Sequence, residues 1–399
     1  MLASLTAATA TALLSPSARV LVASSAPDAG VARAASLPWS DVHWPTLVAL
    51  ATWERAESPI YRLLRAAPSG GVPADVMQAV QGLSRVAEFR AGELEQAATQ
   101  SVDVLRAAGI TPIWLKGAAL AMQSPLGFGV RAMGDLDLLV EAGELGPARS
   151  ALLAGGWDEG AVSRGYDGHH HVAPLVRHAD LRLELHDAIF PPGHPFPDAA
   201  ELSWRAHGVP RQWAGREVRV LDSAWHIAHA SLHWAWSHEG SVGTWQFLHD
   251  IHRFTVTDPD WDEVVAASRE LGGAPVVGMA LWSASRLAGV AVPESVVLAL
   301  RGRPMAWDGL AERAWALRAL HSPMASPSVR WSRFWWRRAV RGIGDEGGAW
   351  PWALGRAAAA VSVPVSGSSP GGAAGIESGV RSGSRMAGWR RHLGRVLRG

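Results

Sequence analysis

Two aspartates two positions apart are the first residues in the sequence whose spacing suggests chemistry. If residues 134–140 (G-D-L-D-L-L-V) form a strand, Asp135 and Asp137 share one face, because side chains alternate along a strand. Neighbouring carboxylates repel each other, so a cation or a proton must relieve the repulsion. Mg²⁺ is the natural partner, since it takes carboxylate and phosphate oxygens. A D-x-D pair alone is weak evidence, because most such pairs lie on a solvated surface.

A third carboxylate follows in residues 181–186 (L-R-L-E-L-H). The same alternation puts Arg182, Glu184 and His186 on one face. If this strand pairs beside the aspartate strand, Glu184 completes a cradle of three carboxylates. Such a cradle can hold two ions that stabilise the attacking and the leaving oxygen of a phosphoryl transfer. The sequence therefore predicts that these three carboxylates are both the catalytic residues and the metal ligands.

Lys116 and Gly117 precede the carboxylates, where a short apolar strand (110–115) gives way to a helix. Lys116 is the only lysine among 37 basic residues, and the others are all arginine. An ammonium is a compact point charge, so a position that keeps lysine can require that geometry in place of a planar guanidinium. Chance survival is the alternative explanation.

The elements that must position these residues form a small mixed sheet. Strands are expected at 110–115, 135–140, 171–176 and 181–186, with helices beginning at Lys116 and covering 144–153. Helical periodicity surrounds this region on both sides. The apolar positions of residues 74–108 recur every three or four residues, which predicts a core-facing helix: Val76, Val80, Leu83, Val86 and Phe89.

The predicted fold class is α+β, a small mixed-sheet core flanked by N-terminal and C-terminal helical subdomains. The predicted organisation is a disordered N-terminus (1–38), a helical subdomain (39–108), the α/β core (109–222), a second helical subdomain (223–322), a basic-aromatic segment (323–365) and a disordered Gly/Ser/Arg-rich tail (366–399).

Composition narrows the class of protein. Hydrophobic residues make up 48% and charged residues 18% of the 399 residues, which is typical of a globular protein with a sizeable core. The formal net charge of +1 argues against long nucleic acids as partners. The lack of cysteine fits a reducing compartment, and no secretory signal or apolar run of membrane-spanning length is evident, so a cytoplasmic location is expected.

Three segments together resemble a known family: residues 115–119 (L-K-G-A-A), 131–140 (R-A-M-G-D-L-D-L-L-V) and 183–186 (L-E-L-H). They are similar to a little-characterised family of nucleotidyltransferases whose members often occur in biosynthetic clusters for lasso and related peptides. The resemblance extends over roughly residues 45–320. It implies a polymerase-beta-like nucleotidyltransferase core that uses an NTP with Mg²⁺ or Mn²⁺.

The resemblance also implies a role for each residue. Asp135 and Asp137 would bind both metals, and Glu184 would bind the catalytic metal and take the acceptor's proton. Backbone N–H groups at the Gly117 turn would bind the triphosphate, with positive charge from Lys116 and Arg131. The wider superfamily has a serine after this glycine, whereas this chain has an alanine at position 118, so Lys116 is the candidate to replace the missing hydroxyl.

Other interpretations remain open at this point. His226, His229 and His233, with the pair His249-Asp250, resemble the ligand set of an HD-type phosphohydrolase, although histidines among tryptophans more often serve packing. A catalytically weak nucleotide-binding or accessory protein is the second alternative. The acceptor of an active transferase would be a small molecule, a peptide or a protein.

Two further segments carry minor expectations. Residues 330–341 combine arginine and tryptophan, so they either pack their tryptophans inward or make a peripheral membrane contact. The run His169–His171 is expected to be a loop that enters a strand, with metal binding as the alternative.

Overall fold

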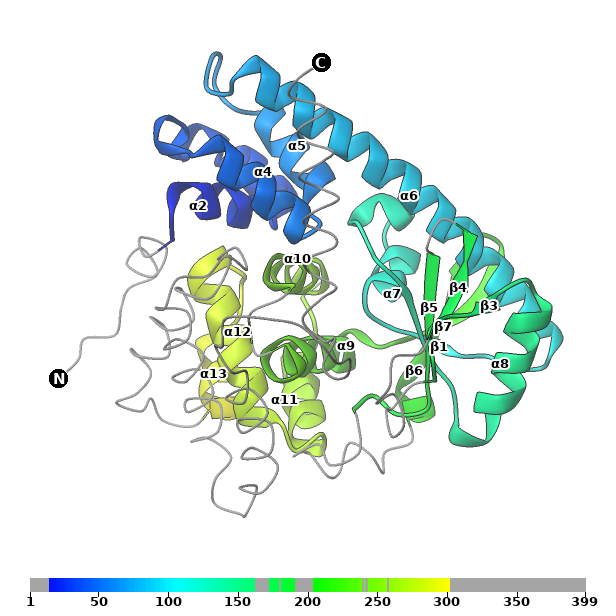
Figure 1. Cartoon of the computed structure of the whole chain (residues 1–399). Helices are drawn as coiled ribbons and strands as arrows, with labels where there is room; N and C mark the ends of the chain where they lie inside the picture. The colour runs from blue at the N-terminus through cyan, green and yellow to red at the C-terminus, as the bar shows by residue number, and fades with distance from the viewer. Residues whose placement is uncertain are drawn as a thin grey trace, which may run out of the picture. The chain divides into compact units, whose positions relative to one another are not determined.

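The computed structural model describes residues 14–161, 172–178, 181–190, 204–238, 240, 243–256 and 258–301. Within these residues the fold is α+β, as expected, with one mixed sheet between groups of helices (Figure 1). The segment 323–365, the tail 366–399 and the run His169–His171 lie outside the described residues, so the expectations for them stay predictions.

The sheet has seven strands in the order β3-β4-β5-β2-β1-β7-β6. Strand β2 pairs in parallel with β5 and antiparallel with β1, and β1 pairs in parallel with β7. The strands are β1 (Ile113–Trp114), β2 (Leu136–Leu139), β3 (Asp158–Glu159), β4 (Leu175–Arg177), β5 (Leu181–His186), β6 (Gly208–Trp213) and β7 (Arg216–Leu221).

Three of these strands were not expected from the sequence. Strand β3 has only two residues, both exposed. Strands β6 and β7 form a hairpin whose turn residues, Ala214 and Gly215, both have positive φ, at 48° and 72°. Two left-handed residues match the twist of a hairpin, but turns of this kind usually carry Asn-Gly or Asp-Gly, so Ala-Gly gives a weak signal.

Helices begin earlier in the chain than predicted. Residues 14–38 were expected to be disordered, yet helix α2 (Pro16–Ala23) buries Val20 and Leu21 completely. Ser15 caps this helix by accepting a hydrogen bond from the backbone N–H of Ala18, and Pro16 occupies its first turn. The expectation of disorder is therefore wrong for residues 14–38, because this alanine-rich stretch carries both a cap and an apolar face.

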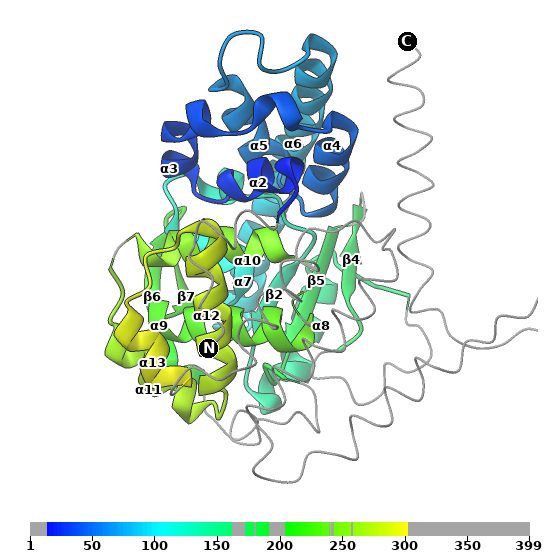
Figure 2. The same ribbon diagram turned by 90° about the vertical axis from the view of Figure 1, so that its left-hand side faces the viewer.

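The remaining N-terminal helices gather beyond one end of the sheet (Figure 2). They are α3 (Pro27–Ala32), η1 (Ala34–Ser36), η2 (Trp39–Asp41), α4 (Trp44–Trp53), α5 (Glu57–Arg65) and the long α6 (Ala74–Ala107), which continues along the sheet and contacts α8.

Helix α6 ends within one residue of the predicted bound, and Val76, Val80 and Leu83 pack against the core as predicted, whereas the other two apolar positions do not. Val86 and Phe89 are 66% and 72% exposed, so they do not face the core. The buried side of this part of the helix carries Ser84 and Ala91 instead. Small residues let α6 approach its neighbours closely, but they give little hydrophobic signal in the sequence. The sequence pattern therefore assigns Val86 and Phe89 to the buried face of α6, although both lie on its exposed face.

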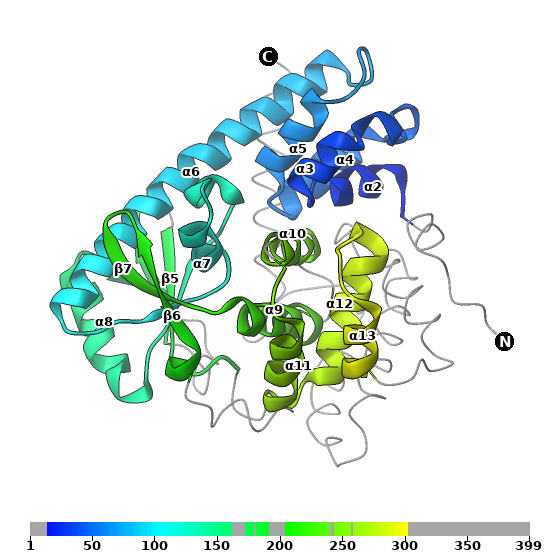
Figure 3. The ribbon, with the colours of Figure 1, turned by 180° about the vertical axis from the view of Figure 1, so that it is seen from behind.

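Helices cover both faces of the sheet (Figures 1 and 3). One face carries α6 and α8 (Leu145–Ala154), and the other carries α7 (Lys116–Gln123). The C-terminal helices pack beyond α7: α9 (Ser223–Leu232), the π-helix η8 (His233–Ser237), α10 (Thr244–Thr255), α11 (Trp261–Glu270), α12 (Ala274–Ala288) and α13 (Glu294–Arg301). Short 3₁₀ turns complete the described chain: η3 (Gly127–Val130), η4 (Ala142–Glu144) and η7 (Trp204–His207).

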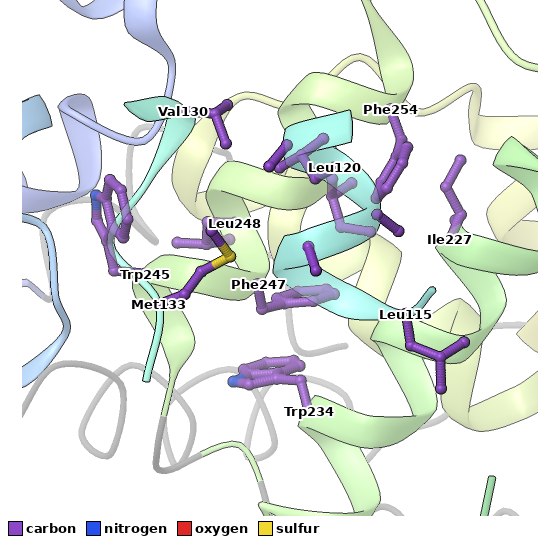
Figure 4. Close-up of a cluster of buried hydrophobic side chains, with 14 of the residues drawn as sticks. Leu115, Leu120, Val130, Met133, Ile227, Trp234, Trp245, Phe247, Leu248 and Phe254 are labelled. Carbon is purple, nitrogen blue, oxygen red and sulfur yellow. The ribbon is translucent and has the colours of Figure 1, made fainter. Parts of the chain in front are cut away.

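An aromatic and aliphatic cluster joins α7 to α9 and α10 (Figure 4). Trp234 and Phe247 stack with ring centroids 4.3 Å apart, and Leu120 of α7 is buried in the same cluster. The indole N–H of Trp234 donates to Thr244 Oγ1 at 3.2 Å. Several tryptophans therefore serve the core with a satisfied N–H, as expected. No helix of the described residues is long and apolar enough to cross a membrane.

Glu54 links the N-terminal helices to α10. Its Oε2 accepts a hydrogen bond from the backbone N–H of Trp245, in the first turn of α10, at 2.9 Å. Burial raises the pKa of Glu54 to about 7, and the hydrogen bond from Trp245 only partly offsets this. The carboxyl group therefore caps α10 and still holds a proton about half of the time at pH 7.

This burial predicts a pH-dependent stability. Because the folded-state pKa lies above the unfolded value of 4.5, stability is lost as pH rises from 4.5 through 7. In the Glu54→Gln variant the amide oxygen can still accept from Trp245, but it cannot ionise. The thermal midpoint of this variant should match the wild type at pH 5 and exceed it at pH 8. Equal midpoints at both pH values would contradict the buried, proton-holding carboxyl.

Candidate functional site

The parallel pairing of β2 with β5 brings the predicted carboxylates together. Asp137 lies directly opposite Glu184 in the register of the two strands. Asp135 precedes β2 by one residue, and its charge adds to the burial and to the Asp137 charge that raise the pKa of Glu184. The predicted strand pairing is confirmed, and all three carboxylates lie in one region.

Lys116, which follows β1 and begins α7, lies beside the carboxylate of Asp137. The antiparallel pairing of β1 with β2 continues as a hydrogen bond from Leu115 N to Asp137 O at 3.0 Å, which places the next residue beside Asp137. Lys116 Nζ then donates to Asp137 Oδ1 at 2.7 Å. Burial disfavours the ammonium, but Asp137 and Asp135 outweigh it and raise the pKa of Lys116 above its usual value. The only lysine thus stays charged among the carboxylates.

Lys116 also adopts an unusual backbone conformation, with φ at 50°. A residue with a Cβ pays roughly 1 kcal/mol or more for this left-handed region, which glycine enters freely. Such strain persists only where the surrounding structure enforces it, and it concentrates at functional sites.

His186 is a member of the site that was not assigned a role from the sequence. Its Nε2 lies 3.1 Å from Asp137 Oδ1 and 3.8 Å from Glu184 Oε2. One potential ligand atom from each of these three residues lies within 4.8 Å of the others. Strand alternation put His186 on the face of Glu184, so its presence was foreseeable, but its direct contact with Asp137 was not.

The pKa shifts of the carboxyl groups reflect their burial and their closeness to one another. Burial raises the pKa of Glu184 to about 7, and the charges of Asp137 and Asp135 add to the effect. Asp137 behaves in the opposite way. Burial favours its protonated form, but Lys116 and His186 outweigh burial and hold its pKa well below the usual range. Without a further cation, Glu184 is therefore protonated for about half of the time near pH 7.

This donor set fits a divalent ion. Two carboxylates and one imidazole, each with a ligand atom within 4.8 Å of the others, can hold a divalent ion, and the imidazole favours Mn²⁺ over the harder Mg²⁺. Binding would replace the proton on Glu184. Asp137, Glu184 and His186 are the residues best placed to hold the ion, with Asp135 adjacent.

Gly117, the second residue of α7, lies beneath two side chains. A Cβ at this position would lie 2.6 Å from Met133 Sδ and 2.8 Å from Arg131 Nη2. The absence of a side chain thus lets residues 131–133 close over the start of the helix. Glycine is needed here for close approach and not for a positive φ.

We expect Gly117→Ala to displace Met133 and Arg131 from the start of α7. Overpacking of this kind costs about 1–3 kcal/mol, and NTP binding at the displaced turn should weaken at the same time. Gly82→Ala is the matched control, because nothing lies within 4 Å of a Cβ there and alanine favours the α6 helix. Thermal melts and NTP titrations of both variants test this. An unchanged Gly117→Ala protein would contradict the close packing.

Arg131 has a partner other than a phosphate. Its Nε and Nη2 donate to the two carboxylate oxygens of Asp250 in α10, at 2.7 and 2.9 Å, and both side chains are buried. Its Nη1 donates to the carbonyl of Ala132. The predicted contact with the triphosphate stays a prediction, whereas the observed role of Arg131 is to join the sheet core to the C-terminal helices.

The HD-type interpretation is wrong. Both oxygens of Asp250 accept from Arg131, and His249 stacks on Trp245 with ring centroids 5.0 Å apart. His226 stacks on Phe254 at 4.7 Å. Among the residues that the structure describes, the only group of three that could hold a metal is Asp137, Glu184 and His186.

Two histidines of the supposed HD set nevertheless approach the carboxylates. His229 of α9 and His233 of the π-helix have ring centroids 5.9 Å apart. Burial lowers the pKa of both well below the usual value, and the Lys116 ammonium lowers it further. They therefore present neutral imidazoles toward Lys116. A π-helix interrupts a regular helix most often at functional sites.

Comparison with known proteins agrees with this geometry. The chain matches a family described as uncharacterised nucleotidyltransferase over residues 40–289, which is more than half of its length. No curated protein and no solved structure gave a match. With the carboxylates, Lys116 and the Gly117 turn inside the matched range, the chain belongs to this family of nucleotidyltransferases.

Proposed function

We propose that the protein transfers a nucleoside monophosphate from an NTP to an acceptor, with a divalent ion and release of pyrophosphate. The observation that carries this proposal is the register that sets Asp137 opposite Glu184, with Asp135 at the start of the same strand. Membership of the nucleotidyltransferase family supports the reaction class.

Each residue has a role in this proposal that its surroundings support. A divalent ion held by the carboxylates would supply electrostatic stabilisation of the phosphate oxygens. Lys116 keeps Asp137 ionised, and His186 orients that carboxylate by its contact at 3.1 Å. Glu184, whose pKa burial raises to about 7, is the carboxylate proposed to take the proton from the acceptor.

The proposed reaction forms one bond and breaks one. An oxygen of the acceptor attacks the α-phosphorus, and the bond from that phosphorus to the oxygen bridging the α- and β-phosphates breaks. The proton of the acceptor passes to Glu184, and the β- and γ-phosphates leave together as pyrophosphate. The acceptor is a small molecule, a peptide or a protein.

NTPs labelled at different phosphates test the reaction class. The purified protein is incubated with Mg²⁺ or Mn²⁺, candidate acceptors from a cell extract, and an NTP labelled at either the α- or the γ-phosphate. The proposal predicts that the α-label enters an acceptor and the γ-label appears in pyrophosphate. Transfer of the γ-label to the acceptor would indicate a kinase instead and contradict the proposal.

The same assay addresses the alternative of a catalytically weak nucleotide-binding protein. That alternative is favoured by Ala118, which stands where the wider superfamily has a hydroxyl, and by the ion pair that engages Lys116. A catalytically weak protein of this kind should bind NTP in a metal-dependent manner but transfer no label to any acceptor.

A further inference from the structure

The cations that the sheet and its flanking residues place near the site each face a carboxylate. Lys116 donates to Asp137, and Arg131 is held by Asp250. Arg182 acts on Glu184, whose pKa it lowers, from the β5 side of the carboxylates. The phosphates are expected on the other side, at the Gly117 turn that follows β1, because β1 and β5 flank β2 in the sheet.

Arg55 reaches the Gly117 side from outside the sheet. It follows α4, whose C-terminal cap is Glu54, and its φ is 57°. This position after a helix favours glycine, because the left-handed conformation strains any residue with a Cβ. Because arginine is less favourable than glycine in this backbone conformation, we expect the contacts of the Arg55 side chain to have a role.

The guanidinium of Arg55 lies against the backbone of Gly134, the residue before Asp135. A Cβ built on Gly134 would overlap the Cζ and both terminal nitrogens of Arg55. Met133, the preceding residue, covers Gly117. Residues 133–135 therefore connect three features: the helix start expected to bind phosphate, the Asp135 carboxylate beside the candidate metal ligands and the Arg55 guanidinium.

We propose that Arg55 binds the β- and γ-phosphates of the NTP, so that the N-terminal helical subdomain completes the nucleotide site. This inference rests on the proposed function. A planar guanidinium donates two parallel hydrogen bonds to phosphate oxygens, which gives it both charge and geometric fit. Arg55 thereby supplies charge of the kind that the sequence predicted for Lys116 and Arg131.

Arg55→Gly is the most informative variant, since glycine suits the left-handed backbone and removes only the side chain. The probes are a non-hydrolysable NTP analogue, of the base that binds the wild type best, and the matching NMP, both with Mg²⁺. Loss of a charged hydrogen-bond donor should weaken binding of the NTP analogue by about 10- to 100-fold. NMP binding should remain unchanged, because the NMP lacks the β- and γ-phosphates.

Two controls separate this role from a structural one. Arg65→Ala, which removes an exposed arginine of the same subdomain, should leave both affinities unchanged. Arg55→Lys should recover part of the NTP affinity, because it restores the charge without the planar fork. Thermal midpoints are measured alongside, and Arg55→Gly is expected to stay close to the wild type.

The outcomes distinguish this inference from the proposed function. If the wild type binds the NTP analogue and Arg55→Gly binds it equally well, the role of Arg55 is wrong and the transferase proposal stands. Equal weakening of NTP and NMP would also overturn the role, because it would indicate a distorted site. If the wild type binds no NTP, both proposals fail.

Discussion

The Asp137→Asn variant is expected to lose nucleotidyl transfer by at least about 100-fold, since removal of a group that stabilises charge in an enclosed site costs about 10²–10³ in kcat. Asparagine keeps the shape of the side chain but removes its charge. The variant loses a metal ligand and also leaves the Lys116 ammonium and His186 without their carboxylate partner. Initial rates of pyrophosphate release measure the effect.

Asp158→Asn serves as the matched control for this substitution. Asp158 is an exposed aspartate of β3, at the edge of the same sheet, and it pairs with no residue of the site. Its variant should retain the wild-type rate. Circular dichroism melts of both variants show whether a loss of activity reflects unfolding. A folded Asp137→Asn protein with wild-type activity would contradict the assignment of the catalytic carboxylates.

The second large effect is expected on stability, from the buried pair Arg131–Asp250. Removal of one partner leaves the other charge buried and uncompensated, which costs about 3–5 kcal/mol. We therefore expect Asp250→Ala to lower the midpoint of urea unfolding strongly. The double variant Arg131→Met/Asp250→Leu should recover most of that loss, because apolar residues of similar volume can replace a buried ion pair.

The chain provides a control pair with the same geometry at the surface. Arg216 donates from Nε and Nη2 to both oxygens of Asp103, each at 2.7 Å, but this pair is exposed. Exposed pairs contribute about 0–1 kcal/mol, so Asp103→Ala should barely change the unfolding midpoint. Equal losses in Asp250→Ala and Asp103→Ala would show that burial of the Arg131 pair is not what stabilises the protein.

Local patterns were sufficient to predict the strands that carry the chemistry. The alternation in L-R-L-E-L-H gave the bounds of β5 correctly, and alternation in D-L-D-L-L-V located β2 to within two residues at each end. Alternation alone did not establish that these strands are neighbours. The order of the segments in the family resemblance carried that prediction, and the pairing of Asp137 with Glu184 confirms it.

Local sequence patterns could not predict the contacts between segments that are far apart in the chain. Arg131 and Asp250 are 119 positions apart, and nothing near either residue indicates its partner. For His229 and His233 the sequence favours packing and leaves a separate metal site as the alternative, because the spacing of histidines on a helix does not reveal which surface the helix meets. Arg55 gave no signal at all, since its left-handed φ and its approach to Gly134 exist only in the folded chain.

The most direct test of the central claim measures NTP binding with and without a divalent ion, and it requires no acceptor. A non-hydrolysable NTP analogue is titrated by calorimetry into the wild type and into Asp135→Asn/Asp137→Asn, in Mn²⁺ and in EDTA. Binding to the wild type should require Mn²⁺ and should be lost in the double variant. Binding of equal strength in EDTA, or unchanged Mn²⁺-dependent binding to the double variant, would show that these aspartates do not hold a metal for the nucleotide.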